Sequence, residues 1–189
     1  VALDTLTDGN VDAMCLNPRT QKLYVANGET RTVSVFDCVA DTLITWFHLL
    51  TISDFSSIAC DTVADRVYAT GYWQGWYQVL VIDGIADTLV VTMPGPKQGR
   101  LYASSRQGRM YCTDSYGPAL AVFDTGTDSL LRNIFIGGDS RRMCYDSTDD
   151  KVYYASYSFR GEVGAINVAT NKPVAHIQVG PTPQDIVWH

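Results

Sequence analysis

Positive charge is scarce in this sequence: 14 Lys and Arg stand against 20 Asp and Glu, which gives a net charge of −6 and a pI near 4.8. Because binding to nucleic acid depends on clustered positive charge, we expect no nucleic-acid partner. Long apolar runs are also lacking. The longest, from Leu43 to Ile52, is interrupted by Thr45, His48 and Thr51 and falls short of the roughly 20 residues that cross a bilayer. We therefore expect no membrane span.

Local catalytic motifs are missing as well. The sequence has no G-x-S-x-G nucleophile motif, no glycine-rich phosphate loop and no Cys-x-x-Cys pair. Its three histidines, His48, His176 and His189, show no ligand spacing with cysteine or acidic residues. No local motif thus identifies a catalytic residue, and the sequence predicts neither a metal site nor a cofactor.

What the sequence has in abundance is apolar and aromatic residues, with 46% hydrophobic residues, 11 Tyr and 4 Trp. This composition is typical of a folded protein rich in strands. The length of 189 residues allows a single domain with a sizeable core.

A repeat organises the whole chain. Four similar segments contain tyrosines spaced 44, 43 and 42 residues apart, namely KLYVAN (Tyr24), RVYATG (Tyr68), RMYCTD (Tyr111) and KVYYAS (Tyr153). An alternating apolar strand that ends in Asp or Asn follows each of them: VSVFD, VLVID, LAVFD and VGAIN. A turn and a further strand come next, and another strand precedes each tyrosine. Each repeat therefore predicts four short strands, here called a to d, without a helix.

A four-stranded antiparallel sheet of this kind cannot cover both of its faces, so the units must pack face to face. The sequence predicts an all-β fold, a β-propeller of four-stranded antiparallel blades in one domain over residues 1–189. Its four complete blades cover approximately residues 11–49, 56–93, 100–136 and 141–179. A surplus strand is expected at each end, over residues 1–6 and 184–188. Such a ring is a piece of a larger propeller, is completed by another chain, or closes as a small ring.

The repeat resembles the YVTN family of propeller repeats, most closely in the segment LNPRTQKLYVANGETRTVSVFDCVADTLIT of the first blade. The resemblance covers nearly the whole chain. The fourth blade departs from the pattern with Asn167 in place of Asp, and the third with Met110 and Cys112 around its tyrosine. The resemblance implies an extracellular, cell-surface or periplasmic location, because YVTN proteins are commonly secreted or displayed on bacterial and archaeal surfaces.

Five cysteines are an odd number, and in the alignment of the repeats Cys15, Cys60 and Cys144 occupy equivalent places. Equivalent places in a ring lie too far apart for mutual pairing. We therefore expect these cysteines to be small buried residues.

The b–c loops suggest the one candidate binding site. Together with the d–a connections they lie at one end of the blades, and the loop GYWQGWYQ of the second blade is rich in aromatic residues where polar ones are usual. Aromatic rings beside Arg31, Arg100, Arg141 and Arg142 favour a stacking surface for a protein or carbohydrate ligand; the alternative is that Trp73 and Trp76 pack against neighbouring loops. The candidate residues are Tyr72, Trp73, Trp76, Tyr77, Tyr116, Tyr157, Phe159 and Arg160.

Recurring carboxylate pairs close the c–d turns, and the first is Asp37 with Asp41. Their spacing lacks the ligand pattern of a calcium loop, so we expect a turn-forming role.

The composition as a whole favours a non-enzymatic scaffold or binding module, which self-association or further blades would complete as a ring. The alternative is a propeller enzyme, lactonase- or quinoprotein-like, with residues drawn from several blades.

Overall fold

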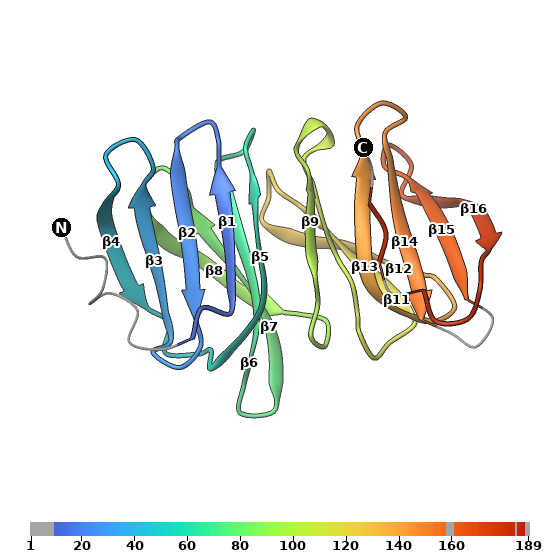
Figure 1. The fold of residues 1–189 in the computed structure, drawn as a ribbon, viewed down its shortest axis with the longest axis horizontal. Coiled ribbons are helices and arrows are strands. Elements are labelled where there is room, and N and C mark those ends of the chain that lie inside the picture. The colour runs from blue at the N-terminus through green and yellow to red at the C-terminus, as the bar shows by residue number, and fades with distance from the viewer. Residues whose placement is uncertain (1–9, 158–160, 184, 188–189) are drawn as a thin grey trace. The chain divides into compact units, whose positions relative to one another are not determined.

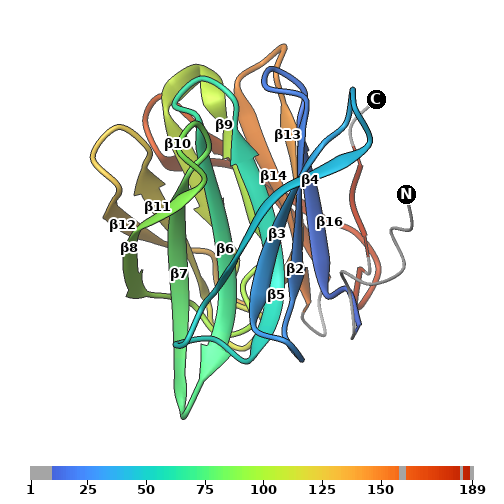
Figure 2. The same cartoon turned by 90° about the vertical axis from the view of Figure 1, so that its left-hand side faces the viewer.

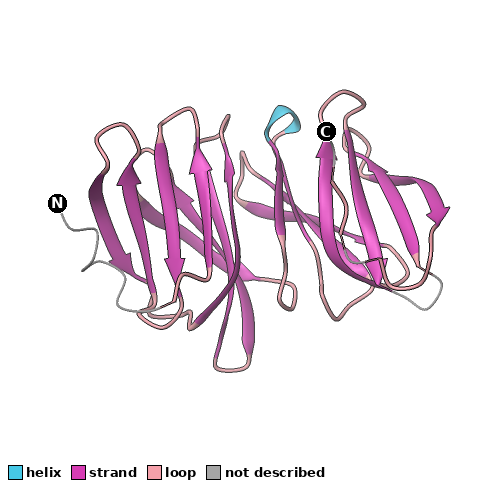
Figure 3. Ribbon diagram, in the orientation of Figure 1, coloured by secondary structure: helices cyan, strands magenta, loops and turns pink. Residues whose placement is uncertain are grey.

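The computed structural model describes residues 10–157, 161–183 and 185–187, and strands dominate it (Figures 1 and 3). Four antiparallel sheets of four strands each follow one another along the chain. They belong to two compact units, Val1–Pro94 and Gly95–His189. Of the surplus strands predicted at the ends, residues 1–6, 184 and 188 lie outside the described residues, and residues 185–187 form no strand.

The first unit contains two sheets, blade 1 and blade 2, with the strand orders β1-β2-β3-β4 and β5-β6-β7-β8. Each strand pairs with the next one along the chain, as in a meander. The strands are β1 (Ala13–Asn17), β2 (Lys22–Asn27), β3 (Thr32–Asp37), β4 (Thr42–His48), β5 (Asp54–Asp61), β6 (Arg66–Trp73), β7 (Trp76–Asp83) and β8 (Thr88–Pro94).

The second unit contains blade 3 and blade 4, built in the same way. A short 3₁₀ helix, η2 (Ser105–Gln107), lies between β9 and β10, where the sequence predicted no helix. The strands are β9 (Leu101–Ser104), β10 (Arg109–Cys112), β11 (Ala119–Asp124), β12 (Ser129–Phe135), β13 (Asp139–Asp146), β14 (Lys151–Tyr157), β15 (Glu162–Asn167) and β16 (Lys172–Gln178).

The c–d turns use their carboxylates in the way the sequence predicted. In blade 1, Asp37 Oδ1 accepts hydrogen bonds from the backbone N–H groups of Val39 (2.8 Å) and Ala40 (3.0 Å). These N–H groups, that of Ala40 first, lower the pKa of the Asp37 carboxyl. Asp41 then closes the turn with a φ of 51°, which Asp tolerates. The turn-forming role is thus confirmed, and it recurs with acceptors Asp83, Asp124 and Asn167 and closing residues Asp87, Asp128 and Asn171.

The blades of each unit pack face to face through apolar side chains. In the first unit, Tyr24, Val33 and Val35 of blade 1 share one buried cluster with Val67 and Ile82 of blade 2. In the second unit a corresponding cluster joins the two blades, with Tyr111 and Val122 of blade 3 and Val152, Tyr154 and Ile166 of blade 4. Apolar burial between sheets therefore holds the blades of each unit together.

The repeat tyrosine adds a polar contact between blades 1 and 2. The Tyr24 hydroxyl lies 3.0 Å from the Gly84 carbonyl oxygen and 2.9 Å from Asp87 Oδ1, both in the c–d turn of blade 2. Lys22 Nζ pairs with the other oxygen of Asp87 at 2.7 Å. Burial and then the hydrogen bond to Asp87 raise the pKa of Tyr24, so its hydroxyl stays protonated and can donate.

The second unit repeats this contact with a neutral acceptor. The Tyr111 hydroxyl donates to Asn171 Oδ1 at 2.8 Å, and Asn171 occupies the turn position that Asp87 holds in blade 2. Burial raises the pKa of Tyr111 as well. The repeat tyrosine thus bonds the residue that closes the c–d turn of the next blade, once in each unit.

Candidate functional site

The candidate site in the first unit is the aromatic tip, which we define as Tyr72, Trp73, Trp76 and Tyr77. These residues form cross-strand pairs, Tyr72 with Tyr77 and Trp73 with Trp76. The adjoining strands end earlier, since their last pairs are Asp54 with Tyr72 and Gln78 with Pro94. The β6–β7 hairpin therefore projects beyond the rest of blade 2, as Figures 1 and 2 show.

The sequence prediction of a b–c loop here is wrong in one respect. Residues Tyr72 to Tyr77 are not an irregular loop but two paired strands joined by a turn of two residues, Gln74 and Gly75. Both turn residues have positive φ, 47° and 96°, as two-residue hairpin turns of the type I′ family require. A short turn and a cross-strand ladder hold the aromatic side chains in place.

The four residues of the aromatic tip differ in what they contact. Tyr72 and Tyr77 pack together with their ring centroids 5.0 Å apart. Trp73 is half-buried, and the Arg31 guanidinium of blade 1 lies over its ring at 4.4 Å from the centroid. Trp76, by contrast, is 74% exposed. The structure thus gives Trp73 a packing role and leaves Trp76 open to solvent.

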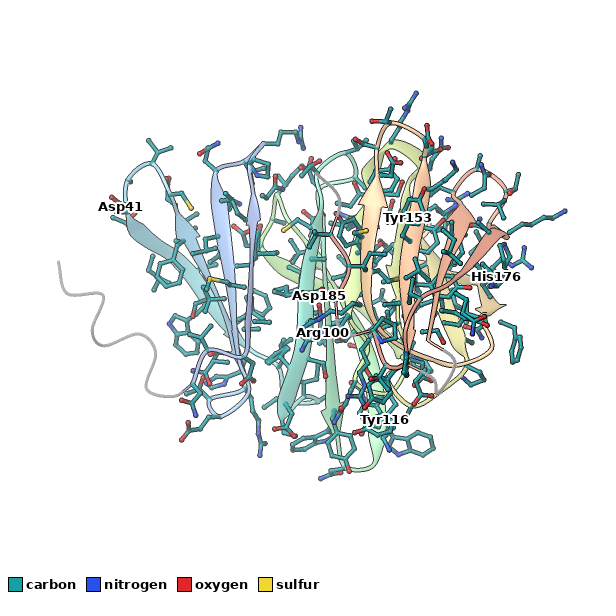
Figure 4. The ribbon with its side chains drawn as sticks, turned by 45° about the vertical axis from the view of Figure 1, so that its right-hand side comes forward. Asp41, Arg100, Tyr116, Tyr153, His176 and Asp185 are labelled. Carbon is teal, nitrogen blue, oxygen red and sulfur yellow. The ribbon has the colours of Figure 1, made fainter. Side chains whose placement is uncertain are left out.

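The second unit has two aromatic residues with the same kind of cation contact. Lys97 Nζ lies 4.2 Å from the ring centroid of Tyr116, which is 55% exposed and is labelled in Figure 4. The Arg141 guanidinium lies 4.4 Å from the ring centroid of the half-buried Tyr157. Phe159 and Arg160, also predicted for the site, lie outside the described residues.

The remaining arginines of this end have polar neighbours. Arg142 Nε lies 3.7 Å from Asp185 Oδ1. Partial burial, and then the like charge of Arg142, lower the pKa of Arg100.

The described part of the chain shows no group of three or more His, Cys, Asp and Glu side chains that could hold a metal ion. His48 and His176 lie on β4 and β16, the outer strands of blades 1 and 4. In the same residues there is no helix long and apolar enough to span a membrane.

The cysteines correct a prediction made from the sequence alignment. Cys15 pairs with Tyr24, whereas Cys60 pairs with Val67 rather than with Tyr68. Their positions therefore differ by one residue, and a shift of one residue turns a side chain to the opposite face of its strand. Cys15 faces blade 2 and Cys60 faces blade 1, and the two thiols lie within hydrogen-bonding reach. They are not too far apart to pair.

No protein-family model matches the sequence, and no curated protein matches it either. Solved structures do. Hydrazine synthase from Kuenenia stuttgartiensis superposes with a TM-score of 0.76 at 14% identity, over 95% of this chain and 53% of that one. A functionally unknown protein from Desulfotomaculum acetoxidans superposes with a TM-score of 0.80 at 10% identity, over 96% of this chain and 60% of that one.

These likenesses concern the fold alone, because the identities are low. The chain spans little more than half the length of the two proteins that it matches. With its four antiparallel four-stranded sheets, the chain is an all-β protein, a β-propeller with four blades. The fold class predicted from the repeat is confirmed.

Proposed function

We propose that this chain is a non-enzymatic propeller scaffold, a binding module that takes a protein or carbohydrate ligand at the end where the b–c loops and d–a connections lie. The observation that carries the proposal is the aromatic tip, where Trp76 is 74% exposed on a hairpin that projects beyond its sheet. Large exposed aromatic rings in a fixed position are typical of binding surfaces.

The tip is also well prepared for binding. Its two-residue turn restricts the backbone, and Arg31 holds the ring of Trp73 behind it. A ligand that stacks on Trp76 therefore orders few additional groups, which lowers the entropic cost of binding. The apolar faces of sugar rings and of peptide side chains both suit such a surface.

A propeller enzyme, lactonase- or quinoprotein-like, is the alternative that we do not favour. Shifted pKa values in the described residues belong mainly to turn carboxylates such as Asp37, to interblade tyrosines such as Tyr24 and to cysteines in the packed sheets. Turn formation and packing account for these shifts without a reaction.

The location follows from the resemblance of the repeat to YVTN proteins. We infer an extracellular, cell-surface or periplasmic setting, in which a surface-exposed binding module has access to glycans and to proteins of other cells. The acidic composition, with a net charge of −6, supports a ligand other than nucleic acid.

We also propose that the open face of blade 1 accepts another blade, through self-association or from further propeller blades. We define this face as Met14, Leu16, Leu23 and Phe36; the last three share a side of the sheet through cross-strand pairs. Met14 is 63% exposed and Leu16 is 51% exposed. Leu23 and Phe36 are half-buried, and a row of exposed and half-buried apolar side chains is a surface that favours association.

Blade 2 shows what covers a face of this kind. Its row of Cys60, Val67 and Ile82 matches Leu16, Leu23 and Phe36 in the cross-strand register, and it packs against blade 1. The residues that close the c–d turns support the same conclusion. Asp87 of blade 2 accepts a hydrogen bond from Tyr24 of the preceding blade, whereas the equivalent Asp41 of blade 1 is exposed (Figure 4). A blade with a b-strand tyrosine fits both features of blade 1.

The ligand proposal is tested with a panel of immobilised oligosaccharides and a library of displayed peptides, followed by titration of any hit. Trp76→Ala should weaken binding at least about tenfold, because a central aromatic anchor is lost. Phe135→Ala is the matched control, since Phe135 is also 72% exposed but lies on the outer strand β12. Equal loss in both variants, or no hit from either panel, would overturn the proposal.

A further inference from the structure

Two thiols meet between the first two blades. Cys15 lies on β1 and Cys60 on β5, the first strands of blades 1 and 2, and these strands pack against each other. In blade 1, Cys15 shares its side of the sheet with Tyr24 and Val35 through cross-strand pairs. These residues belong to the buried cluster that joins the two blades.

The second thiol approaches from the opposite sheet. Cys60 shares its side with Val67 and Ile82, which belong to the same cluster. Both cysteines pack against this cluster, and both are partly exposed. The register of each sheet therefore directs the two side chains toward each other, and solvent reaches them.

We propose that Cys15 and Cys60 form a redox site, a dithiol that an external disulfide oxidant converts into a disulfide between blades 1 and 2. This inference is independent of the ligand proposed for the aromatic tip. The other three cysteines provide the contrast: Cys112 and Cys144 are buried, and Cys38 lies in the β3–β4 turn.

The oxidation is a thiol–disulfide exchange in two steps. The thiolate of one cysteine attacks a sulfur of oxidised glutathione, so that a mixed disulfide forms and one glutathione thiolate leaves. The second cysteine thiolate attacks the protein sulfur of the mixed disulfide and releases the second glutathione. The two cysteines lose two protons and two electrons, and oxidised glutathione takes up the electrons as it is reduced to two thiols.

The pairing also governs how fast this exchange proceeds. The hydrogen bond with Cys60, followed by burial, raises the pKa of the Cys15 thiol. Because the thiolate is the attacking species, the reaction is slow at neutral pH and quickens as the pH rises. A disulfide between the blades would then persist in an oxidising compartment.

The experiment treats the folded chain with oxidised glutathione, counts the remaining thiols and maps the linked peptides by mass spectrometry. We expect the loss of two of the five thiols, a peptide pair joined through Cys15 and Cys60, and no retained glutathione. The oxidised chain should melt about 5–15 °C higher, since the link restricts the unfolded chain. The rate should increase with pH.

Variants separate this site from general thiol reactivity. Cys15→Ser and Cys60→Ser should each abolish the linked peptide pair, whereas Cys38→Ser should leave it unchanged. Peptide mapping of the unmodified chain needs no variant and so gives an answer even if one of them folds poorly. Mixed disulfides with glutathione that persist at Cys15 or Cys60 when the reaction is complete would overturn the proposal. So would the absence of a Cys15–Cys60 link after prolonged oxidation of the folded chain.

Discussion

Two buried tyrosines of the second unit differ in the hydrogen bonding of their hydroxyls, and this difference tests the interblade contact. The Tyr111 hydroxyl donates to Asn171 Oδ1 at 2.8 Å, and both residues are buried. Tyr154 is buried in the same apolar cluster, but its hydroxyl has no hydrogen-bond partner among the described residues. Replacing each tyrosine with phenylalanine removes one hydroxyl from a similar environment.

The expected effects have opposite signs. Tyr111→Phe leaves the buried Asn171 oxygen without its donor, which should lower the free energy of unfolding by about 1–3 kcal/mol. Tyr154→Phe removes a buried polar atom that gains nothing from the fold, so it should be neutral or stabilise the protein by up to about 1 kcal/mol. Burial also raises the pKa of Tyr154 to about 12, which is what a hydroxyl without a stabilised anion shows.

Calorimetry, together with urea unfolding followed by circular dichroism, measures the change in the free energy of unfolding for both variants. Tyr24→Phe in the first unit extends the series, because its acceptor Asp87 is charged and the loss should be about 1.5–3 kcal/mol. If Tyr154→Phe destabilised the protein as much as Tyr111→Phe does, the loss would not depend on the acceptor Asn171, and the reasoning on the interblade hydrogen bond would be refuted.

Two further predictions concern packing and pH. Gly164→Ala should destabilise the protein by about 1–3 kcal/mol in urea unfolding, because an added Cβ would overlap the buried ring of Tyr154; an unchanged midpoint would show that the ring moves aside. The N–H of Ala86, together with that of Ile85, lowers the pKa of Asp83, so its stabilising effect is present above an unfolded pKa of about 4 and is lost as the pH falls through the folded value. The Tm should therefore fall less steeply below about pH 4 in Asp83→Asn than in the unmodified chain, and parallel curves would contradict this.

The strands were predictable because a regular spacing of tyrosines, alternating apolar residues and Asp-containing turns all repeat four times. These signals are local, and the structure places a four-stranded sheet on each repeat. The turn role of Asp37 was predictable for the same reason, since its hydrogen bonds reach only two and three residues ahead.

Contacts between blades were harder to predict, because they depend on register. The alignment treated Cys15 and Cys60 as equivalent, yet the pairing of Cys60 with Val67 shifts it by one residue and reverses its direction. The bond between Tyr24 and Asp87 joins residues 63 positions apart, and only the packing of blade 1 on blade 2 brings them together. A regular recurrence of tyrosine and of a turn-closing Asp or Asn was the available signal.

The aromatic tip combines a feature that was predictable from the sequence with one that was not. The excess of aromatic residues marked it in the sequence, but the pair Gln74 and Gly75 was not recognised as a two-residue turn. With that turn the segment extends β6 and β7 instead of forming a loop, and it separates the half-buried Trp73 from the exposed Trp76.

The central claim is that the blades pack through one repeated face and that, where no further blade covers it, the open face of blade 1 takes a blade of a second copy of the chain. Light scattering over a concentration series tests it most directly. The account predicts particles of at least twice the 20.8 kDa chain mass, which Leu16→Asp reduces to single chains, while Val63→Asp in the β5–β6 turn does not. A constant mass of 20.8 kDa for the unmodified chain at every concentration would contradict it.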